Sequence, residues 1–124
     1  MNEGHIVVID DCRLTRTIIR DILEAAGHEV VAVESGIEAN PHIYKSPPPK
    51  MLIIDVLMPM LNGDQKVRLL KGRESSRNIP VVLMSTKPEA ELKALAAAAG
   101  ADGYLLKPVK KEALLQMVNF LGSL

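Results

Sequence analysis

Five short apolar runs, separated by segments with helical character, constrain the fold of this chain more than any other feature. The runs are nearly continuous in hydrophobicity and consist mostly of β-branched or aliphatic residues. Such runs are typical of strands that are buried on both faces of a sheet. The five predicted strands are Ile6–Ile9, Val30–Val33, Met51–Ile54, Val81–Met84 and Tyr104–Leu106.

Helical segments separate most of these strands. After the first strand, apolar residues recur at helical spacing from Leu14 to Ala26, and Gly27 follows as a C-terminal stop. The alternation of strands and helices predicts an α/β fold with a parallel sheet, whose ligands gather at the carboxyl ends of the strands. The later predicted helices are Gln65–Lys71, Glu89–Ala99 and Lys111–Leu121.

The second helix is the irregular one. Asn40 and Pro41 interrupt a helix that should begin near Ile37, and the three prolines at 47–49 forbid helix before the third strand. We therefore expect a short or distorted helix at this point.

Composition excludes several classes of function. A chain of 124 residues is the size of one domain, and its 15 basic residues balance its 15 acidic ones, so no overall charge attracts nucleic acid or a membrane. An aromatic content of 2% without tryptophan argues against stacking on single-stranded nucleic acid. A single cysteine, Cys12, and the lack of a signal or membrane-spanning segment favour the cytoplasm.

Acidic residues follow two of the predicted strands. Asp10 and Asp11 end the first strand and Asp55 ends the third, so neighbouring parallel strands would bring them to one edge. Crowded carboxylates favour protons or a cation, and an oxygen-only set suits Mg²⁺ or Mn²⁺. Taken singly, Asp10 and Asp11 could instead cap the first helix, and Asp55 could begin a turn before Pro59.

Two further strand ends complete this chemistry. Ser85 ends the fourth strand with a hydroxyl, and Lys107 follows the fifth strand with an ammonium group. A carboxylate nucleophile, a metal, a lysine and a hydroxyl on one rim suit phosphoryl transfer.

Four blocks of sequence carry a family resemblance, and together they are highly specific. They are Val8–Asp11, Leu52–Pro59 with Asn62-Gly63, Pro80–Ser85 and Gly100–Pro108. In these blocks the chain resembles the receiver domains of bacterial two-component response regulators, the CheY-like superfamily. The resemblance implies one receiver domain over residues 1–124, with a doubly wound, flavodoxin-like (βα)5 fold and the strand order 2-1-3-4-5.

The resemblance also implies roles for the residues at the strand ends. Asp55 would be the phosphoacceptor, and Asp11 and Asp55 would bind Mg²⁺ together with the carbonyl of Leu57. Asp10 would orient metal-bound water, and Lys107 would pair with the phosphoryl group.

Two residues would read out phosphorylation. In the family pattern, Ser85 is the switch hydroxyl and Tyr104 the switch aromatic, so the Ser85 hydroxyl moves inward and the Tyr104 ring follows. This motion would change the face formed by the fourth helix, the fifth strand and the fifth helix. The resemblance further implies a cis peptide bond between Lys107 and Pro108.

The expected partners follow from the same resemblance. A histidine kinase or phosphotransfer protein would donate the phosphoryl group, and a downstream protein or an attached output domain would receive the signal. A homodimer through the switch face is also allowed, whereas direct contact with nucleic acid or membrane is not expected. The chain would catalyse only its own phosphorylation and dephosphorylation and would not be an enzyme in the usual sense.

Three other functions compete with this interpretation. A haloacid-dehalogenase-like phosphohydrolase needs a second acid two residues after its nucleophile, where this chain has Leu57. A dinucleotide- or flavin-binding module needs a glycine-rich turn, whereas the first turn here is the acidic segment Asp10–Arg13. A pseudo-receiver that binds proteins without being phosphorylated stays open as the alternative.

Overall fold

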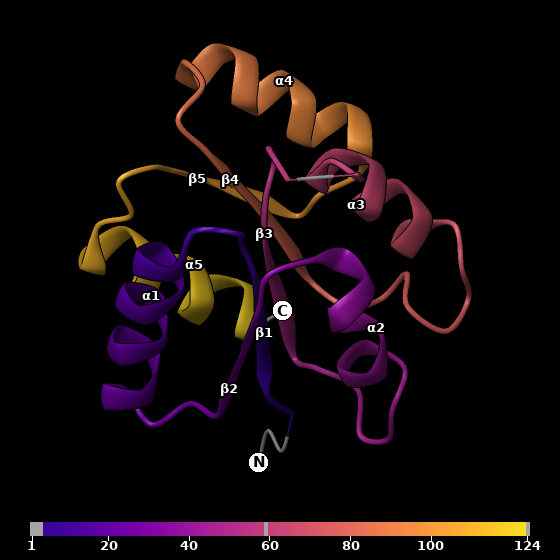
Figure 1. The fold of residues 1–124 in the computed structure, drawn as a ribbon, viewed down its shortest axis with the longest axis horizontal. Helices are drawn as coiled ribbons and strands as arrows, with labels where there is room; N and C mark the ends of the chain where they lie inside the picture. Colours follow the sequence, from indigo (N-terminus) through magenta and orange to yellow (C-terminus); the bar gives the residue numbers. More distant parts are fainter. Residues whose placement is uncertain (1–3, 59, 124) are drawn as a thin grey trace.

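The computed structural model, which describes residues 4–58 and 60–123, confirms the predicted α/β fold. Its five strands pair in parallel in the order β2-β1-β3-β4-β5, which is the predicted order (Figure 1). Pro59, part of the motif after the third strand, lies outside the described residues. The strands are β1 (Ile6–Ile9), β2 (Val30–Val33), β3 (Met51–Asp55), β4 (Val81–Ser85) and β5 (Gly103–Leu106).

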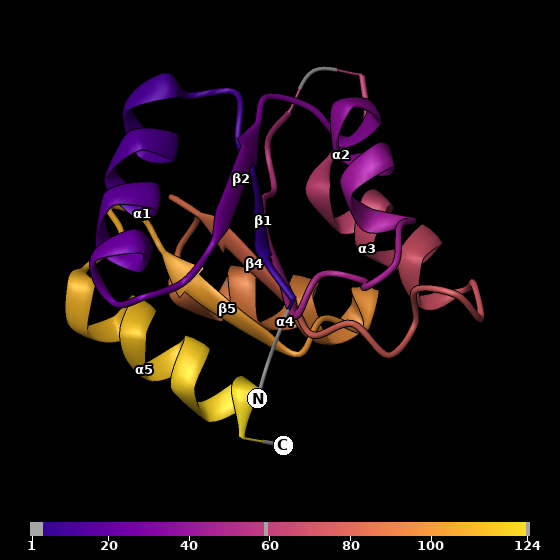
Figure 2. The same ribbon diagram turned by 90° about the horizontal axis from the view of Figure 1, so that it is seen from below.

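Five helices cover the sheet on both faces. Figure 2 shows α1 and α5 on one side of the sheet and α2 and α3 on the other, and α4 packs into the same core as α2 and α3. No helix among the described residues is long and apolar enough to cross a membrane. The helices are α1 (Arg13–Ala25), α2 (Gly36–Ile43), α3 (Gly63–Lys71), α4 (Glu89–Ala99) and α5 (Lys111–Gly122).

The central strands are continuously apolar because each of them serves two cores. Successive side chains of a strand point to opposite faces, and Ile6 and Val8 pack with α1 and α5. Val7 and Ile9, which alternate with them, pack with the core on the α2, α3 and α4 side. A hydrophobic run without polar gaps is therefore required at the centre of this sheet.

For the two outer strands, the prediction that both faces are buried is wrong. All residues of β1, β3 and β4 are buried, whereas every residue of β2 is only partly buried and Leu106 of β5 is 40% exposed. β2 and β5 are the two edges of the sheet, so one side of each strand has no neighbouring strand. An apolar run does not reveal which strands will be at the edges.

Helix α2 is short, as predicted, but it is not interrupted. It continues through Pro41, and its N-cap is Ser35, whose side-chain oxygen accepts a hydrogen bond from the backbone N–H of Glu38 at 3.2 Å. Pro41 lacks only the N–H that would have bonded to the carbonyl of Ile37. One missing hydrogen bond does not end an eight-residue helix that is capped at its start and packed on the sheet.

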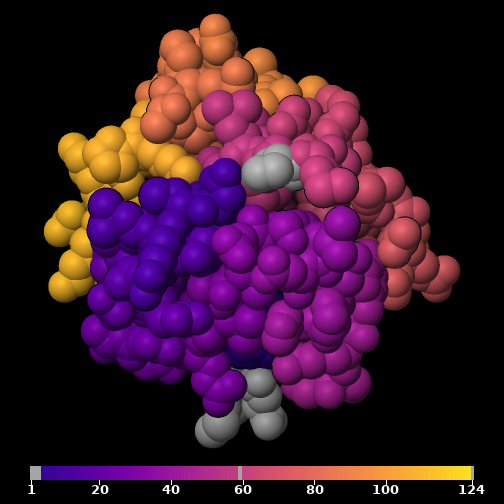
Figure 3. Space-filling model, in the orientation of Figure 1, coloured from indigo at the N-terminus to yellow at the C-terminus, as the bar shows by residue number. Residues whose placement is uncertain are grey.

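The loop after β3 folds back tightly against the strand. The N–H of Gly63 donates to the carbonyl of Val56 at 2.8 Å, and a Cβ at Gly63 would clash with the carbonyl oxygen of Asp55. Only glycine permits this approach. In Figure 3 the start of α1, in indigo, and the magenta segments that follow β3 lie on the same face of the molecule.

Candidate functional site

Three aspartates meet at the carboxyl edge of the sheet. β1 and β3 are parallel neighbours with Ile9 opposite Ile54, so the residues that follow, Asp10 and Asp55, emerge side by side. Asp10 is fully buried and Asp55 is 5% exposed, whereas Asp11 is exposed. Each of the three can offer one carboxylate oxygen within 4.8 Å of the other two. The acids that the sequence predicted to converge do so.

Lys107 bridges two of these acids. Its Nζ lies 2.6 Å from Oδ2 of Asp10 and 2.9 Å from Oδ1 of Asp55. Lys107 follows β5, and its N–H donates to the carbonyl of Ser85 at 2.8 Å, which anchors it beside the end of β4. One ammonium group therefore faces a cluster of three carboxylates, and the ionised cluster retains negative charge.

Asp10 is fixed in place by the start of α1. Its Oδ1 accepts a hydrogen bond from the backbone N–H of Cys12 at 2.8 Å, and its carbonyl accepts one from Nη1 of Arg16 at 2.7 Å. Cys12 is the N-cap of α1 and its side chain makes no capping hydrogen bond. The alternative interpretation of Asp10 and Asp11 as N-caps is therefore wrong, because the N-cap lies one residue further on.

The electrostatics of the pocket disfavour further negative charge. Burial raises the pKa of Asp55, the contact with Lys107 lowers it, and the charges of Asp10 and Asp11 raise it again, so that the net shift is upward. Burial lowers the pKa of Lys107, but Asp10 and Asp55 raise it by more, so the ammonium form is favoured. A second cation would relieve the charge at Asp55.

The donor set fits a hard divalent cation. All three side chains offer carboxylate oxygens, which Mg²⁺ and Mn²⁺ prefer, and the exposed Asp11 opens the cluster to solvent. Oδ2 of Asp10 is buried and has no hydrogen-bond partner among the described residues, although it forms the ion pair with Lys107. Leu57, the expected carbonyl ligand, lies two residues after Asp55 with its side chain 56% exposed.

The two expected switch residues make hydrogen bonds to groups outside the cluster of aspartates. Ser85 is buried at the end of β4, and its Oγ accepts a hydrogen bond from the N–H of Lys87 at 3.0 Å. The hydroxyl of Tyr104, on β5, donates to Oε2 of Glu89 at 2.9 Å. Glu89 was missed by sequence reasoning, because an acid in the first turn of a helix indicates only where the helix starts. The Lys107–Pro108 peptide bond is cis, as expected.

Known proteins resemble this chain over nearly its whole length. A family model described as the response regulator receiver domain matches residues 6–119. Protein PilG of Pseudomonas aeruginosa is 33% identical over 92% of this chain and 84% of its own length. Protein PilH of the same organism is 32% identical, covering 94% of this chain and 95% of its own. The structure of chemotaxis protein CheY4 of Vibrio cholerae superimposes with a TM-score of 0.86, at 28% identity, over 97% of this chain and 99% of that one.

Proposed function

This chain belongs to the response regulator receiver domain family, and we propose that it is a phosphoacceptor switch of a two-component phosphorelay. The proposed receiver domain spans residues 1–124. The observation that carries the proposal is the contact of the Lys107 ammonium group with both Asp10 and Asp55, beside Asp11. A nucleophile, acids for a cation and a neutralising lysine thus share one edge of the sheet.

Asp55 is the proposed nucleophile. A carboxylate oxygen of Asp55 attacks the phosphorus of a phosphohistidine on the donor protein, the new P–O bond forms, and the P–N bond breaks to release the imidazole. Lys107 already lies 2.9 Å from this carboxylate, so it is placed to neutralise charge on the transferred group. The product is an acyl phosphate on Asp55.

Asp10, Asp11, Asp55 and the carbonyl of Leu57 are the residues that would hold the cation. Receiver domains bind Mg²⁺ through an acidic pocket, and the cluster of Asp10, Asp11 and Asp55 has this composition. When bound, Mg²⁺ or Mn²⁺ supplies positive charge next to the phosphoryl oxygens. Asp10 is buried and fixed by the N–H of Cys12, and it would orient water at a bound cation.

Ser85 and Tyr104 are the proposed readout. In the proposed switch, the Ser85 hydroxyl exchanges its contact with the N–H of Lys87 for one with a phosphoryl group on Asp55. Tyr104 lines a cavity of about 650 Å³ between α4, β5 and α5, together with Leu106 and Phe120. This face is the proposed contact for a downstream protein, an attached output domain or a second copy of the chain.

The proposed reaction confines catalysis to the chain's own phosphorylation and dephosphorylation, with a histidine kinase or phosphotransfer protein as donor. The pseudo-receiver alternative would be favoured by the loss of one of the required groups. Among the described residues, Asp10, Asp11, Asp55, Ser85 and Lys107 are all present at the carboxyl edge. Nothing in this set favours the alternative.

The test is uptake of phosphate from acetyl phosphate in the presence of Mg²⁺, measured as the mass of the intact protein. The wild type should gain one phosphate, and Asp55→Ala should gain none. Asp21→Ala is the matched control, because it removes an exposed aspartate of α1 with the same change in mass. Equal uptake by Asp55→Ala would contradict the assignment of Asp55, and no uptake by the wild type would favour the pseudo-receiver.

A further inference from the structure

One side chain of α4 holds the switch aromatic residue. The Tyr104 hydroxyl donates to Oε2 of Glu89 at 2.9 Å, and Glu89 is the first residue of α4. Tyr104 is partly buried, and both residues line the 650 Å³ cavity between α4, β5 and α5. The hydrogen bond therefore joins β5 to the beginning of α4 at the face where the signal is proposed to be read.

Glu89 is also tied to the switch hydroxyl through the backbone. Only Thr86, Lys87 and Pro88 separate it from Ser85, and the N–H of Lys87 donates to the Ser85 Oγ at 3.0 Å. The N-cap of α4, Pro88, makes no capping hydrogen bond with its side chain. If the Ser85 hydroxyl turns toward Asp55, the segment that leads to Glu89 loses this hydrogen bond to the end of β4.

The backbones of β4 and β5 are less free to move than the segment between Ser85 and Glu89. β4 and β5 are paired with Leu83 opposite Tyr104, and the N–H of Lys107 donates to the carbonyl of Ser85 at 2.8 Å. Motion of Ser85 can therefore reach Tyr104 most easily through its side chain and through the segment that leads to Glu89.

We propose that Glu89 is a positioning residue of the switch, whose carboxylate holds Tyr104 in the arrangement in which Ser85 is bonded to Lys87. This inference rests on the proposed function of the Asp55 site. Because the hydrogen bond favours the arrangement in which Ser85 is bonded to Lys87, it opposes a move of the Ser85 hydroxyl toward a phosphoryl group on Asp55. By thermodynamic reciprocity, phosphorylation must in turn weaken the bond between Tyr104 and Glu89.

A spectroscopic measurement isolates this bond. The hydrogen bond to Glu89, burial and the charge of Glu89 together raise the pKa of Tyr104. The chain has two tyrosines and no tryptophan, so a Tyr44→Phe background leaves Tyr104 as the only ionising phenol. In this background, Glu89→Ala should lower the pKa of Tyr104, measured by tyrosinate absorbance while circular dichroism reports that the fold is retained.

Glu91→Ala is the matched control. Glu91 is the other acid in the first turn of α4 and is exposed like Glu89, so both acids interact with the same helix N-terminus. Its removal should leave the pKa of Tyr104 unchanged. An equal change in both variants would assign the effect to general charge and would overturn the role of Glu89.

The effect on the switch is measured with beryllofluoride, a phosphoryl analogue, and Mg²⁺, and binding is followed by fluorine NMR. Loss of a hydrogen bond to a carboxylate should tighten binding about fivefold in Glu89→Ala and leave Glu91→Ala unchanged. Tyr104→Phe, which removes the donor, should give the same gain. The double variant Glu89→Ala, Tyr104→Phe should gain no more than either single change.

The outcomes distinguish failure of this inference from failure of the function on which it rests. Unchanged or weaker binding in Glu89→Ala, together with a lowered pKa of Tyr104, would overturn the positioning role. A wild type that does not bind beryllofluoride would overturn the proposed function and this inference with it. Glu89→Met has a side chain of similar length without a carboxylate to accept the Tyr104 hydroxyl, and it substitutes for the alanine variant if the latter does not fold.

Discussion

The strands of the sheet begin at its amino edge and end at its carboxyl edge. Each of these two edges has a lysine beside an aspartate, but the two arrangements differ in charge. At the carboxyl edge, Lys107 contacts Asp10 and Asp55, with Asp11 in the same cluster. At the amino edge, the Nζ of Lys71 lies 2.8 Å from Oδ2 of Asp102. The charges balance one to one at the amino edge and leave an excess of carboxylates at the carboxyl edge.

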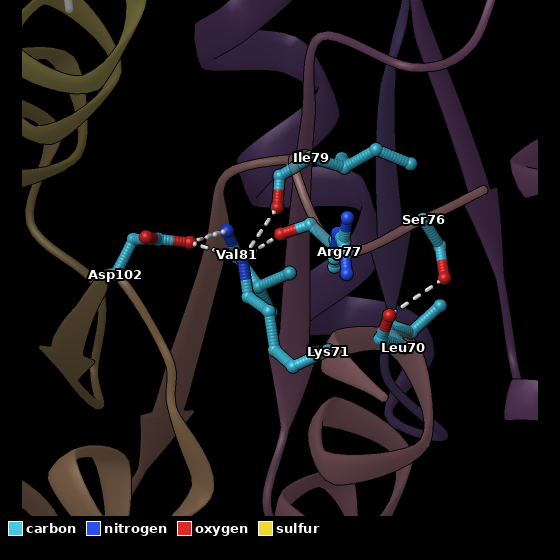
Figure 4. A network of polar contacts seen from close by, with 7 residues as sticks. All are labelled: Leu70, Lys71, Ser76, Arg77, Ile79, Val81 and Asp102. Atoms are coloured by element: carbon cyan, nitrogen blue, oxygen red, sulfur yellow. Dashed lines mark hydrogen bonds and ion pairs between the residues drawn. The ribbon is translucent and has the colours of Figure 1, made fainter. Parts of the chain in front are cut away.

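At the amino edge, the polar groups of the network shown in Figure 4 form hydrogen bonds and an ion pair with one another. Lys71 also donates to the carbonyls of Arg77 and Ile79 at 3.1 and 2.9 Å, so each of its three ammonium protons has an acceptor. Asp102 additionally accepts a hydrogen bond from the N–H of Val81 at 2.8 Å. The network fastens α3 to the starts of β4 and β5.

Similar residues at the two edges have different consequences according to how completely they are paired. A balanced network contributes to stability and has no remaining demand for a ligand. A buried cluster with surplus carboxylates is a cost to the folded state, which a cation can relieve. The carboxyl edge is therefore the end of the sheet at which a cation would relieve unbalanced charge.

The largest effect is expected from Lys107→Met. This change leaves the fully buried Asp10 without its cation, so the free energy of unfolding should fall by about 3 kcal/mol without divalent ions. Mg²⁺ should restore part of this loss, because a second cation can neutralise the same acids. Urea unfolding with and without Mg²⁺ measures both, and a loss that Mg²⁺ does not reduce would contradict the proposed cation site.

Lys71→Met is the corresponding change at the amino edge. Asp102 retains its bond from Val81, but the carbonyls of Arg77 and Ile79 lose their donor. Because Asp102 and Lys71 are partly exposed, water replaces some of these bonds, and we expect a loss of about 2 kcal/mol. Mg²⁺ should not rescue this variant, and a rescue equal to that of Lys107→Met would remove the distinction between the edges.

Asp55→Asn should stabilise the protein when Mg²⁺ is absent. Its raised pKa means that the folded state binds the proton of Asp55 more tightly than the unfolded state, so the ionised carboxylate costs stability at neutral pH. Removing it should add about 1 kcal/mol at neutral pH. The gain should vanish as the pH falls below the ordinary pKa of 3.8, because the carboxyl is then protonated in both states. Thermal unfolding across this pH range tests the sign.

A matched change at the amino edge sharpens this prediction. Asp102→Asn removes an ion pair with Lys71 without relieving any crowding of acids. It should destabilise the protein at neutral pH, in the opposite direction to Asp55→Asn. Stabilisation by both variants would show that surplus carboxylates are not specific to the carboxyl edge.

The smallest effect is expected from the backbone at the two edges. Gly100, the C-cap of α4, and Met60, in the loop after β3, have φ angles of 84° and 71°. Gly100→Ala should cost about 1 kcal/mol, since an added Cβ meets Lys71 at an ordinary 3.6 Å and the penalty is the left-handed backbone. Met60→Gly should gain about 0.5 kcal/mol, because relief of the same strain exceeds the entropy cost of glycine. Chemical denaturation of both variants gives the comparison.

Local patterns in the sequence predicted most of the fold. The bounds of Ile6–Ile9 and Glu89–Ala99 agree with the structure, because a buried strand or an alanine-rich helix is specified by its own residues. Asp10, Asp55 and Lys107 were predicted to share an edge because each of them follows a strand, and parallel strands end on the same side of the sheet.

Contacts between distant segments were not predictable in this way. The continuity of α2 through Pro41 depends on its cap and its packing, and the partial burial of β2 and β5 depends on their place in the sheet. The bond of Tyr104 to Glu89 and that of Lys71 to Asp102 join residues 15 and 31 positions apart. No local periodicity specifies such pairs.

The sequence by itself determined the alternating α/β architecture and the set of reactive side chains at the strand ends, because hydrophobic periodicity and strand direction are local properties. Only the tertiary structure decided which charges balance. It placed Lys107 between Asp10 and Asp55, left Asp11 exposed and turned Ser85 and Tyr104 toward Lys87 and Glu89. Ion pairs and hydrogen bonds depend on distances of a few ångströms, and those distances are set by packing of the whole chain.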